Sequence, residues 1–305
     1  MVMHTRTHNQ KHIHYPKPAL LSLFLVPLLI AVGVRAESLY EALPEPARQR
    51  SSVWLAYSSG LNDSRDLYGE ADLVIAGRHH LLLGGGRSNL QSLEGRVDLS
   101  SFKLGYNSAY GEPFEFGLTY DYWGRQDELW TQTLSMPLRW NTLDWSFHIK
   151  PMLSRINLYT QAQPPRPRQL QQTNSQAVEG MINYYGPGNW EFEVSGGVYR
   201  YDGEPERLDN PITSALFSDV SLILAYGFPR SRLGAAVAYN FRAWRVGLYQ
   251  ESTVSLVDNT RLNVTSLKNT FYLGDDFSLN LNGGRVSAEN IESYNFLTVG
   301  GQYLF

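Results

Sequence analysis

One segment of the chain holds the residue types of a nucleophile–base pair. In WSFHIKPMLS, His148 could serve as a general base and Ser154 as a nucleophile, and they stand six residues apart. An even spacing puts both side chains on one face of an extended strand, but about 20 Å apart at ~3.4 Å per residue. A base must lie within hydrogen-bonding reach of its nucleophile, so this spacing does not predict catalysis.

The other candidate motifs favour structural roles. His79 and His80 fall in a turn signal, GRHH, and are expected as solvated turn residues. The run Gly84–Gly86 lacks the Lys and Ser/Thr of a phosphate loop, so it predicts a bulge or close strand packing. The absence of Cys excludes thiolate chemistry and Cys-built metal centres. We expect no enzymatic activity, no cofactor and no metal site.

The N-terminus predicts export. Residues 1–18 are polar and basic, residues 19–34 are mostly apolar, and Val34 and Ala36 provide short side chains at −3 and −1 of a cleavage site before Glu37. This is the pattern of a secretory signal peptide spanning 1–36. An uncleaved anchor is the alternative, but the apolar run falls short of the ~20 residues that span a bilayer.

Charge argues against a nucleic-acid partner. Cleavage would remove Arg6, Lys11, Lys17 and Arg35, which lowers the basic count from 26 to 22 against 29 acidic residues. A mildly acidic exported protein with no basic run is a poor nucleic-acid binder.

The rest of the chain predicts a membrane β-barrel. After a polar periplasmic lead-in at 37–50, segments of roughly ten residues alternate apolar with polar or small residues as far as Phe305, as in PFEFGLTYDYW. A soluble sandwich also alternates. However, aromatic residues end the apolar faces, and no helical segment interrupts residues 51–305, which favours an antiparallel up-and-down barrel in a membrane.

The connections allow the strands to be counted. Short turn signals alternate with longer polar links, as in barrels with short periplasmic turns and longer outer loops. The count gives ten strands by Phe228, including one over 216–228, and five strand-like pieces after Arg232. Because both ends of the barrel should lie on one side, the total must be even. We expect about 14 strands, with 12 and 16 as alternatives.

The last eight residues, TVGGQYLF, carry a recognisable pattern. Thr298, Gly300, Tyr303 and Phe305 match a polar residue, a Gly two places later, and aromatic residues third from last and last. The segment resembles the C-terminal assembly signal of Gram-negative outer-membrane β-barrel proteins. This resemblance implies an outer-membrane location reached through the general secretory pathway, with periplasmic chaperones and the barrel-assembly machinery as partners. It also implies that the final strand closes the barrel.

The inward face of such a barrel would carry charges of both signs. Alternation places twelve candidates in the lumen: Lys103, Asp121, Arg139, Lys150, Glu179, Glu191, Glu193, Asp219, Arg232, Arg245, Glu251 and Lys268. This balance argues against strong ion selectivity. An equally weighted alternative is that opposed charges pair across strands only to stabilise the interior. Bulges expected near Ser100–Ser101 and Pro151 would change which residues of the alternating pattern face inward.

Three functions follow from this fold. The leading hypothesis is a porin-like channel in outer-membrane lipid for passive diffusion of small hydrophilic solutes, because a barrel of 14 strands is wider than the filled eight-stranded kind. The second is an outer-membrane component of a polysaccharide or protein export or assembly pathway. The third is a lipid-modifying barrel enzyme, which the missing nucleophile–base pair disfavours.

Overall fold

A computed structural model describes residues 50–59, 65–92, 95–108, 113–126, 129–159, 170–202, 229–256, 259–288 and 291–305. The expected signal peptide, the lead-in except Arg50, Asp219 and the strand expected over 216–228 lie outside these residues. Apart from one 3-10 turn, η4, at Pro187–Asn189, the regular structure is extended. No helix among the described residues has the length and apolarity needed to cross a bilayer.

The strands follow one another along the chain with short gaps. Their bounds are β1 Ser52–Ser59, β2 Arg65–Ala76, β3 His79–Ser92, β4 Gly95–Ser108, β5 Phe114–Arg125, β6 Leu129–Ser135, β7 Leu138–Asn141, β8 Trp145–Tyr159, β9 Leu170–Tyr185, β10 Trp190–Tyr201, β11 Pro229–Asn240, β12 Trp244–Ser255, β13 Arg261–Tyr272, β14 Phe277–Ala288 and β15 Ile291–Leu304.

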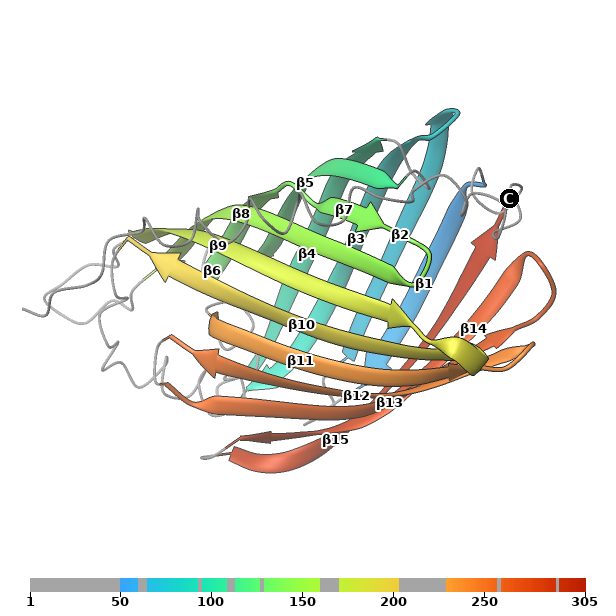
Figure 1. Ribbon diagram of the computed structural model, residues 1–305. Helices are drawn as coiled ribbons and strands as arrows, with labels where there is room; N and C mark the ends of the chain where they lie inside the picture. Colours follow the sequence, from blue (N-terminus) through green and yellow to red (C-terminus); the bar gives the residue numbers. More distant parts are fainter. Residues whose placement is uncertain are drawn as a thin grey trace, which may run out of the picture. The chain divides into compact units, whose positions relative to one another are not determined.

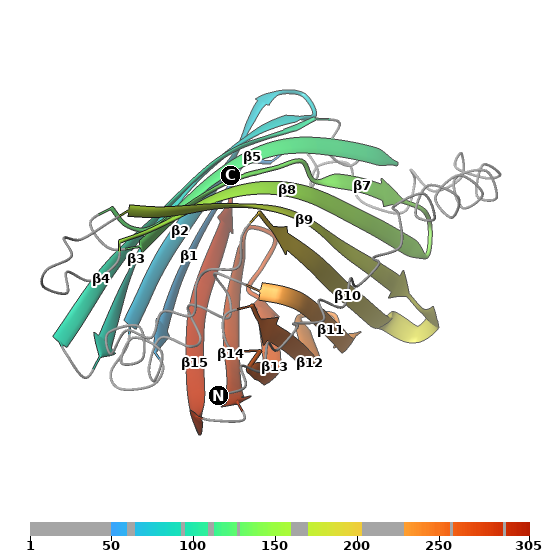
Figure 2. The ribbon, with the colours of Figure 1, turned by 90° about the vertical axis from the view of Figure 1, so that its left-hand side faces the viewer.

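These strands form one closed antiparallel wall. Each strand pairs with its neighbours in sequence, except that β6 and β7 both pair with β5 and β8 and not with each other. Because β1 pairs with both β2 and β15, the described sheet has no free edge. The backbone N–H of Phe305 also donates to the carbonyl of Ser51 at 2.9 Å. Two views show the wall curving so that β10–β13 lie across from β2–β4 (Figures 1 and 2). The prediction that the final strand closes the barrel is confirmed.

The segments β6 and β7 belong to one strand, which Pro137 divides. Opposite β5, Ser135 faces Thr119 and Arg139 faces Glu115, so the register continues across the division. Proline has no N–H for the ladder, but its carbonyl still accepts a hydrogen bond from the N–H of Gly117 at 2.8 Å. The described wall therefore has fourteen strands, as predicted. Residues 203–228 lie between β10 and β11 in the sequence, and these two strands pair directly with each other.

The two ends of the wall differ. Short connections such as Gly77–Arg78 and Thr142–Asp144 lie at the end where the barrel begins and finishes, which we call the turn end. The links 160–169 and 202–228 follow strands that run the other way, toward what we call the loop end. These two links are longer than any connection at the turn end, but the gaps 93–94 and 289–290 at the loop end are as short as the turns, so the predicted asymmetry holds only in part.

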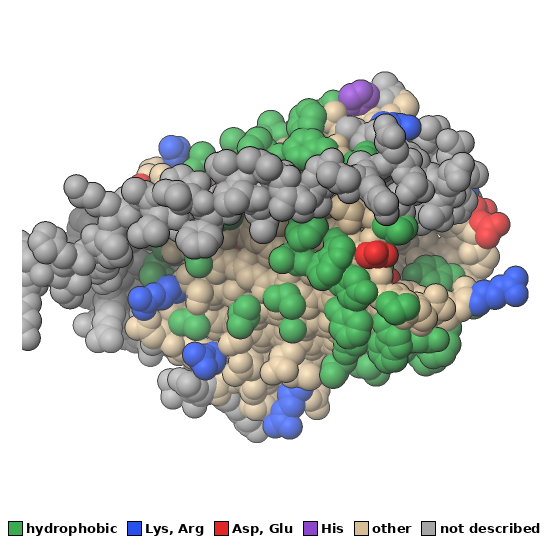
Figure 3. All heavy atoms as spheres, in the orientation of Figure 1, with side chains coloured by type: hydrophobic (Ala, Val, Ile, Leu, Met, Phe, Trp, Pro, Cys, Tyr) green, Lys and Arg blue, Asp and Glu red, His purple; other side chains and the backbone are tan. Residues whose placement is uncertain are grey.

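The outer face is apolar and ends in aromatic rings at the turn end. Leu153, Val198 and Leu233 are each more than half exposed on it. Successive ring contacts, with centroids 4.6 to 6.4 Å apart, run without a break from β7 to β13 through Trp140, Phe147, Trp145, Tyr184, Phe192, Trp190, Tyr239, Phe241, Trp244 and Phe271. Hydrophobic side chains gather at this end of the molecule (Figure 3).

Several local expectations are wrong. The register is regular through Ser100–Ser101 and through Pro151, and it shifts instead at Val74/Ala76, Pro229/Ser231 and Val286/Ala288. Nor do His79 and His80 lie in a solvated turn. They begin β3, where His80 is only 1% exposed and its Nδ1 lies 2.7 Å from the Asp72 carboxylate.

The glycine run on β3 serves close packing. The register through Gly84–Gly86 is unbroken, so the run forms no bulge. A Cβ on Gly86 would lie 2.7 Å from the Leu67 carbonyl oxygen and 2.9 Å from the ring of Tyr68. The interior face here admits no side chain because Tyr68 lies against it.

We predict that Gly284→Ala destabilises the barrel while Gly283→Ala does not. A Cβ at Gly284 would lie 2.5 Å from the Thr265 carbonyl oxygen and 2.7 Å from the Phe296 ring, whereas one at Gly283 would have contacts no closer than 3.8 Å. Overpacking of this kind costs about 1–3 kcal/mol. Urea unfolding of the purified protein in lipid measures both variants, and equal midpoints would contradict the packing.

Candidate functional site

Strand register decides which side chains share a face. In the pairing, Lys103 lies opposite Asp121, and Lys150 lies opposite Glu179. Following such pairs around the wall puts eleven of the twelve expected residues on the face opposite the exposed apolar side chains, which is the interior. They are Lys103 on β4, Asp121 on β5, Arg139 on β7, Lys150 on β8, Glu179 on β9, Glu191 and Glu193 on β10, Arg232 on β11, Arg245 and Glu251 on β12, and Lys268 on β13. Asp219 lies outside the described residues.

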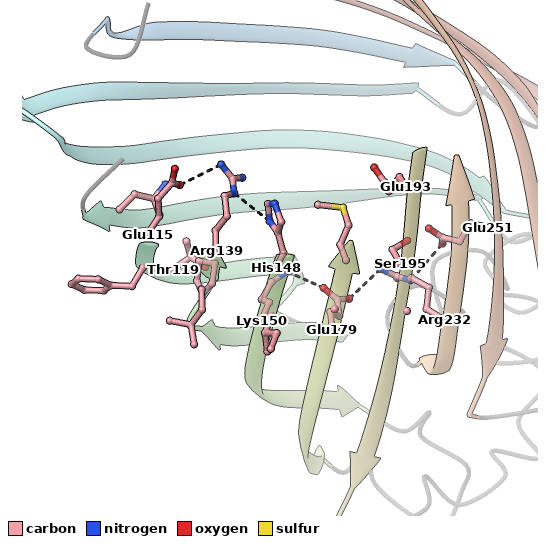
Figure 4. A pocket seen from close by; sticks show the side chains of 18 of the residues that line it. Glu115, Thr119, Arg139, His148, Lys150, Glu179, Glu193, Ser195, Arg232 and Glu251 are labelled. Carbon is pink, nitrogen blue, oxygen red and sulfur yellow. Dashed lines mark hydrogen bonds and ion pairs between the residues drawn. The ribbon is translucent and has the colours of Figure 1, made fainter. Parts of the chain in front are cut away.

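Glu179 is the centre of the largest group of interior charges. Its carboxylate lies 3.1 Å from the ammonium of Lys150 and 3.3 Å from the guanidinium of Arg232, and it accepts a hydrogen bond from the hydroxyl of Tyr199. These partners come from β8, β11 and β10, so one carboxylate on β9 links four strands. Figure 4 shows Glu179 between Lys150 and Arg232.

The group continues to β12 and β13. The Nε of Arg232 lies 3.4 Å from Glu251, whose carboxylate also accepts hydrogen bonds from Tyr249 at 2.5 Å and Thr253 at 3.1 Å. The ammonium of Lys268 lies 3.9 Å from the centroid of the Tyr249 ring. Cation–π contact of this kind orients the lysine without neutralising it.

A second group lies nearer the turn end. Both Nε and Nη2 of Arg245 donate to one oxygen of Glu191, at 2.9 and 2.7 Å, and Asn240 donates to the other oxygen at 2.6 Å. On the facing part of the wall, Arg139 lies 3.3 Å from Glu115. The alternation of the sequence gives Glu115 the same face as Asp121, so parity alone could have found it.

A third pair links the strands on the other side of the barrel. Lys103 donates to Glu70 at 2.8 Å, and Tyr68 donates to the same carboxylate at 3.0 Å. Glu70 was also missed, although it alternates with the apolar residues of its segment. Lys103 pairs with Glu70 although Asp121 lies directly opposite it, because an ion pair depends on side-chain direction as well as on register.

His148 is held in a way that does not suit a general base. Its Nδ1 accepts from Arg139 Nε at 3.4 Å, and its Nε2 lies 2.9 Å from the hydroxyl of Ser146. Because Nδ1 accepts, the proton of the neutral ring belongs on Nε2 and points at Ser146, which itself donates to Asn141 at 2.7 Å. A base that activates serine needs a free lone pair toward the hydroxyl, so these contacts position a polar residue.

Ser154 has a different partner. Its hydroxyl lies 2.8 Å from that of Thr133 on β6, and no contact joins it to His148. In the described part of the chain, no three His, Asp or Glu side chains gather closely enough to hold a metal ion.

Two of the five described candidate carboxylates lack an ion pair. Within the described ranges, neither Asp121 nor Glu193 has a cation within ion-pair distance or a hydrogen-bonding side chain. Glu193 lines both interior cavities described below, and Figure 4 shows its carboxylate directed into the open space. An unneutralised carboxylate in the lumen acts on whatever ion or solute enters.

The interior is hollow beside these groups. A cavity of about 390 Å³ is lined by residues of β3–β5 and β7–β12, including Lys150, Glu179, Arg232 and Glu251. A second cavity of about 280 Å³ lies nearer the turn end, against Asn183, Glu191 and Arg245. Arg139, His148, Met181 and Glu193 line both, so the two cavities adjoin.

Part of the interior face is apolar, which the charge pattern did not predict. Near the loop end of β13–β15, Leu262, Val264 and Val286 are buried, and Tyr294 and Phe296 pack against them. Pairing of Val264 with Val286 puts both on the face that carries Lys268. The interior face of β13–β15 is therefore apolar near the loop end, whereas Lys268 lies farther along the same face of β13.

Comparison with known proteins finds similarity among solved structures. No family model and no curated protein matches. The chain is similar to a loop-deletion mutant of OmpT, an outer membrane protein of Vibrio cholerae, at TM-score 0.45 and 11% identity over 84% of this chain and 98% of that one. It is also similar to the outer membrane protein OpdK of Pseudomonas aeruginosa (TM-score 0.40, 8%, over 84% and 98%). CdiB from Acinetobacter baumannii gives 0.47 and 10%, over 84% and 60%.

We predict that Glu179→Gln destabilises the barrel more than Glu193→Gln does. The first change leaves Lys150 and Arg232 facing each other without their shared carboxylate, at a cost of roughly 1–3 kcal/mol for partly buried pairs. The second removes a carboxylate without an ion pair and should cost less than about 0.5 kcal/mol. Urea unfolding of both variants in the same lipid checks the difference, and equal losses would contradict it.

Proposed function

We propose that this protein is an outer-membrane channel for passive diffusion of small hydrophilic solutes. The apolar outer face and the line of aromatic rings support a position in a lipid bilayer, because lipid-facing strands require both. The turn end would face the periplasm and the loop end the exterior, as the short turns and the two ends of the wall on one side suggest.

The proposal includes the route to the membrane. Residues 1–36 would be a signal peptide for the general secretory pathway and 37–50 a periplasmic lead-in. Periplasmic chaperones and the barrel-assembly machinery would then recognise the tail. The position of the tail supports this role, since Thr298 and Gly300 lie opposite Ser58 and Ala56 at the seam of the barrel. Tyr303 and Phe305 are exposed on the outer face, with ring centroids 6.2 Å apart.

The single observation that carries the channel function is the hollow, charged interior of a closed fourteen-stranded wall. Paired charges keep the wall ordered while leaving polar atoms toward the open space, and water and small polar solutes can replace one another there at little cost. The contacts of His148 and Ser154 give no comparable support to a lipid-modifying enzyme.

Single-channel recording tests the proposal. The protein purified from membranes should produce stable conductance steps when it inserts into a planar bilayer. Insertion is checked independently by the heat-dependent mobility shift of folded barrels on gels. A folded, inserted protein that gives no steps would overturn the channel function.

We predict that Glu193→Lys moves ion preference toward anions. In water, a unit charge about 6 Å from a passing ion contributes ~0.7 kcal/mol, which is roughly threefold in the permeability of one ion. Because the cation and the anion respond in opposite directions, the cation-to-anion permeability ratio should fall by up to about tenfold per unit of charge changed. Glu193→Gln changes one unit of charge in place of two, so the logarithm of the permeability ratio should change by about half as much. The reversal potential in a KCl gradient measures both.

The matched control is Asp275→Lys, in the exposed turn between β13 and β14. The charge change is the same but lies outside the lumen, so the reversal potential should move little. A larger effect at Asp275 than at Glu193 would contradict the assignment of Glu193 to the solute path.

A further inference from the structure

Arginines mark the outer face near the loop end. On six strands the fifth or sixth outward position from the turn end is an exposed Arg: Arg65 on β2, Arg87 on β3, Arg155 on β8, Arg200 on β10, Arg261 on β13 and Arg285 on β14. Among the described residues near them, the outward acids are Asp98, which pairs with Arg87 at 3.1 Å, and Asp202. The outer face therefore has a border of aromatic rings at the turn end and a border of arginines near the loop end.

The height of these arginines fits the thickness of a bilayer. Arg155 follows Trp145 by ten residues on β8, and Arg200 follows Trp190 by ten on β10. Ten residues cover about 33 Å along a strand, or about 25 Å along the axis of a barrel whose strands tilt by ~40°. This is the height of the apolar band of membrane barrels, so both guanidinium groups stand at the level of lipid headgroups.

Arg155 and Arg200 form the best-defined part of this border. Arg155 lies opposite Asn174 on β9, and Arg200 lies opposite Gln176, two residues farther along the same strand. The two arginines are therefore separated by one strand, or about 10 Å across the sheet. Within the described part of the chain neither makes an ion pair, and Asn174 donates to Asp202 at 3.2 Å.

The surface immediately below this pair is apolar. Leu153, Val178 and Val198 occupy the next outward positions on β8, β9 and β10 and are 58%, 48% and 66% exposed. Farther down, Gly196 pairs with Gly180, and neither carries a side chain on this face. Two cations thus lie beside an apolar surface that has a shallow depression at the two glycines. This arrangement suits a molecule with an anionic head group and a hydrocarbon chain.

We infer that Arg155 and Arg200 bind the phosphate groups of a phosphorylated glycolipid in the outer leaflet, with an acyl chain against Leu153, Val178 and Val198. The inference rests on the proposed outer-membrane location. A planar guanidinium donates two parallel hydrogen bonds to phosphate oxygens, and both arginines retain these donors. Burial of an acyl chain on the valines and Leu153 adds apolar contact that free phosphate lacks.

Thermal unfolding in detergent tests the inference on the full protein purified from membranes. Bisphosphorylated lipid A should raise the melting temperature in a concentration-dependent way, since a ligand of the folded state stabilises it. The same lipid without its phosphates should raise it much less, and inorganic phosphate should not raise it. In Arg155→Gln/Arg200→Gln, the apparent Kd for lipid A should weaken about tenfold or more, as expected for loss of charge-assisted hydrogen bonds.

Two controls keep the test decisive. Arg242→Gln removes an exposed arginine from the turn end and should bind lipid A as the unaltered protein does. Arg155→Lys/Arg200→Lys keeps the charge without the planar fork and should weaken binding less than the glutamine pair. If the glutamine pair folds poorly, the two single glutamine variants should each weaken binding by an intermediate factor.

The inference is overturned if the glutamine pair binds lipid A like the unaltered protein, or if dephosphorylated lipid or inorganic phosphate stabilises equally. Both arginines lie on the outer face, so the glutamine pair should leave single-channel conductance unchanged. A protein that binds lipid A without conducting would refute the channel and leave the lipid site standing. A protein that conducts but whose stability does not depend on the lipid phosphates would support the channel and refute the lipid site.

Discussion

Closure of the backbone hydrogen-bond ladder is the constraint on which this structure depends. Hydrocarbon offers no partner for an unpaired N–H or C=O, so a sheet can cross a membrane only when its first and last strands meet. Here β1 meets β15 residue by residue from Ser52–Leu304 to Ser59–Leu297. The wall tolerates Pro137 because only one donor is missing and the register resumes at Leu138.

Once the wall is closed, each strand has two different environments, and the period of two in the sequence separates them. The outward positions are apolar and exposed, as a lipid environment requires of Leu, Val and aromatic rings. The inward positions can carry charge because water and opposite charges compensate it. Glu179 shows how this compensation also fixes the interior, since its partners Lys150, Tyr199 and Arg232 come from three other strands.

The same separation gives the protein its two surfaces of interest. Inside, most of the described charges are neutralised, so in the proposed channel an unpaired carboxylate such as Glu193 would influence solutes more than a paired one. Outside, the aromatic and arginine borders differ in chemistry because the two leaflets they would face differ. The inner surface carries the proposed channel function, and the outer surface carries the proposed lipid site.

Alternation, the tail and the spacing of turn signals predicted a closed antiparallel barrel of about fourteen strands. The period of two follows from local chemistry, whereas the even strand number came from the requirement that both ends of the barrel lie on one side. Alternation also sufficed to give the interior face of residues such as Lys103 and Glu251. The partners of these charges required the tertiary structure: Lys103 contacts Glu70 although Asp121 lies opposite, and Glu179 joins residues up to 53 positions away. Such contacts depend on rotamers and on strands brought together by closure, as do the burial of His80 against Asp72 and the apolar patch around Leu262. A one-dimensional pattern specifies which face a side chain occupies, but closure decides which neighbours it meets there.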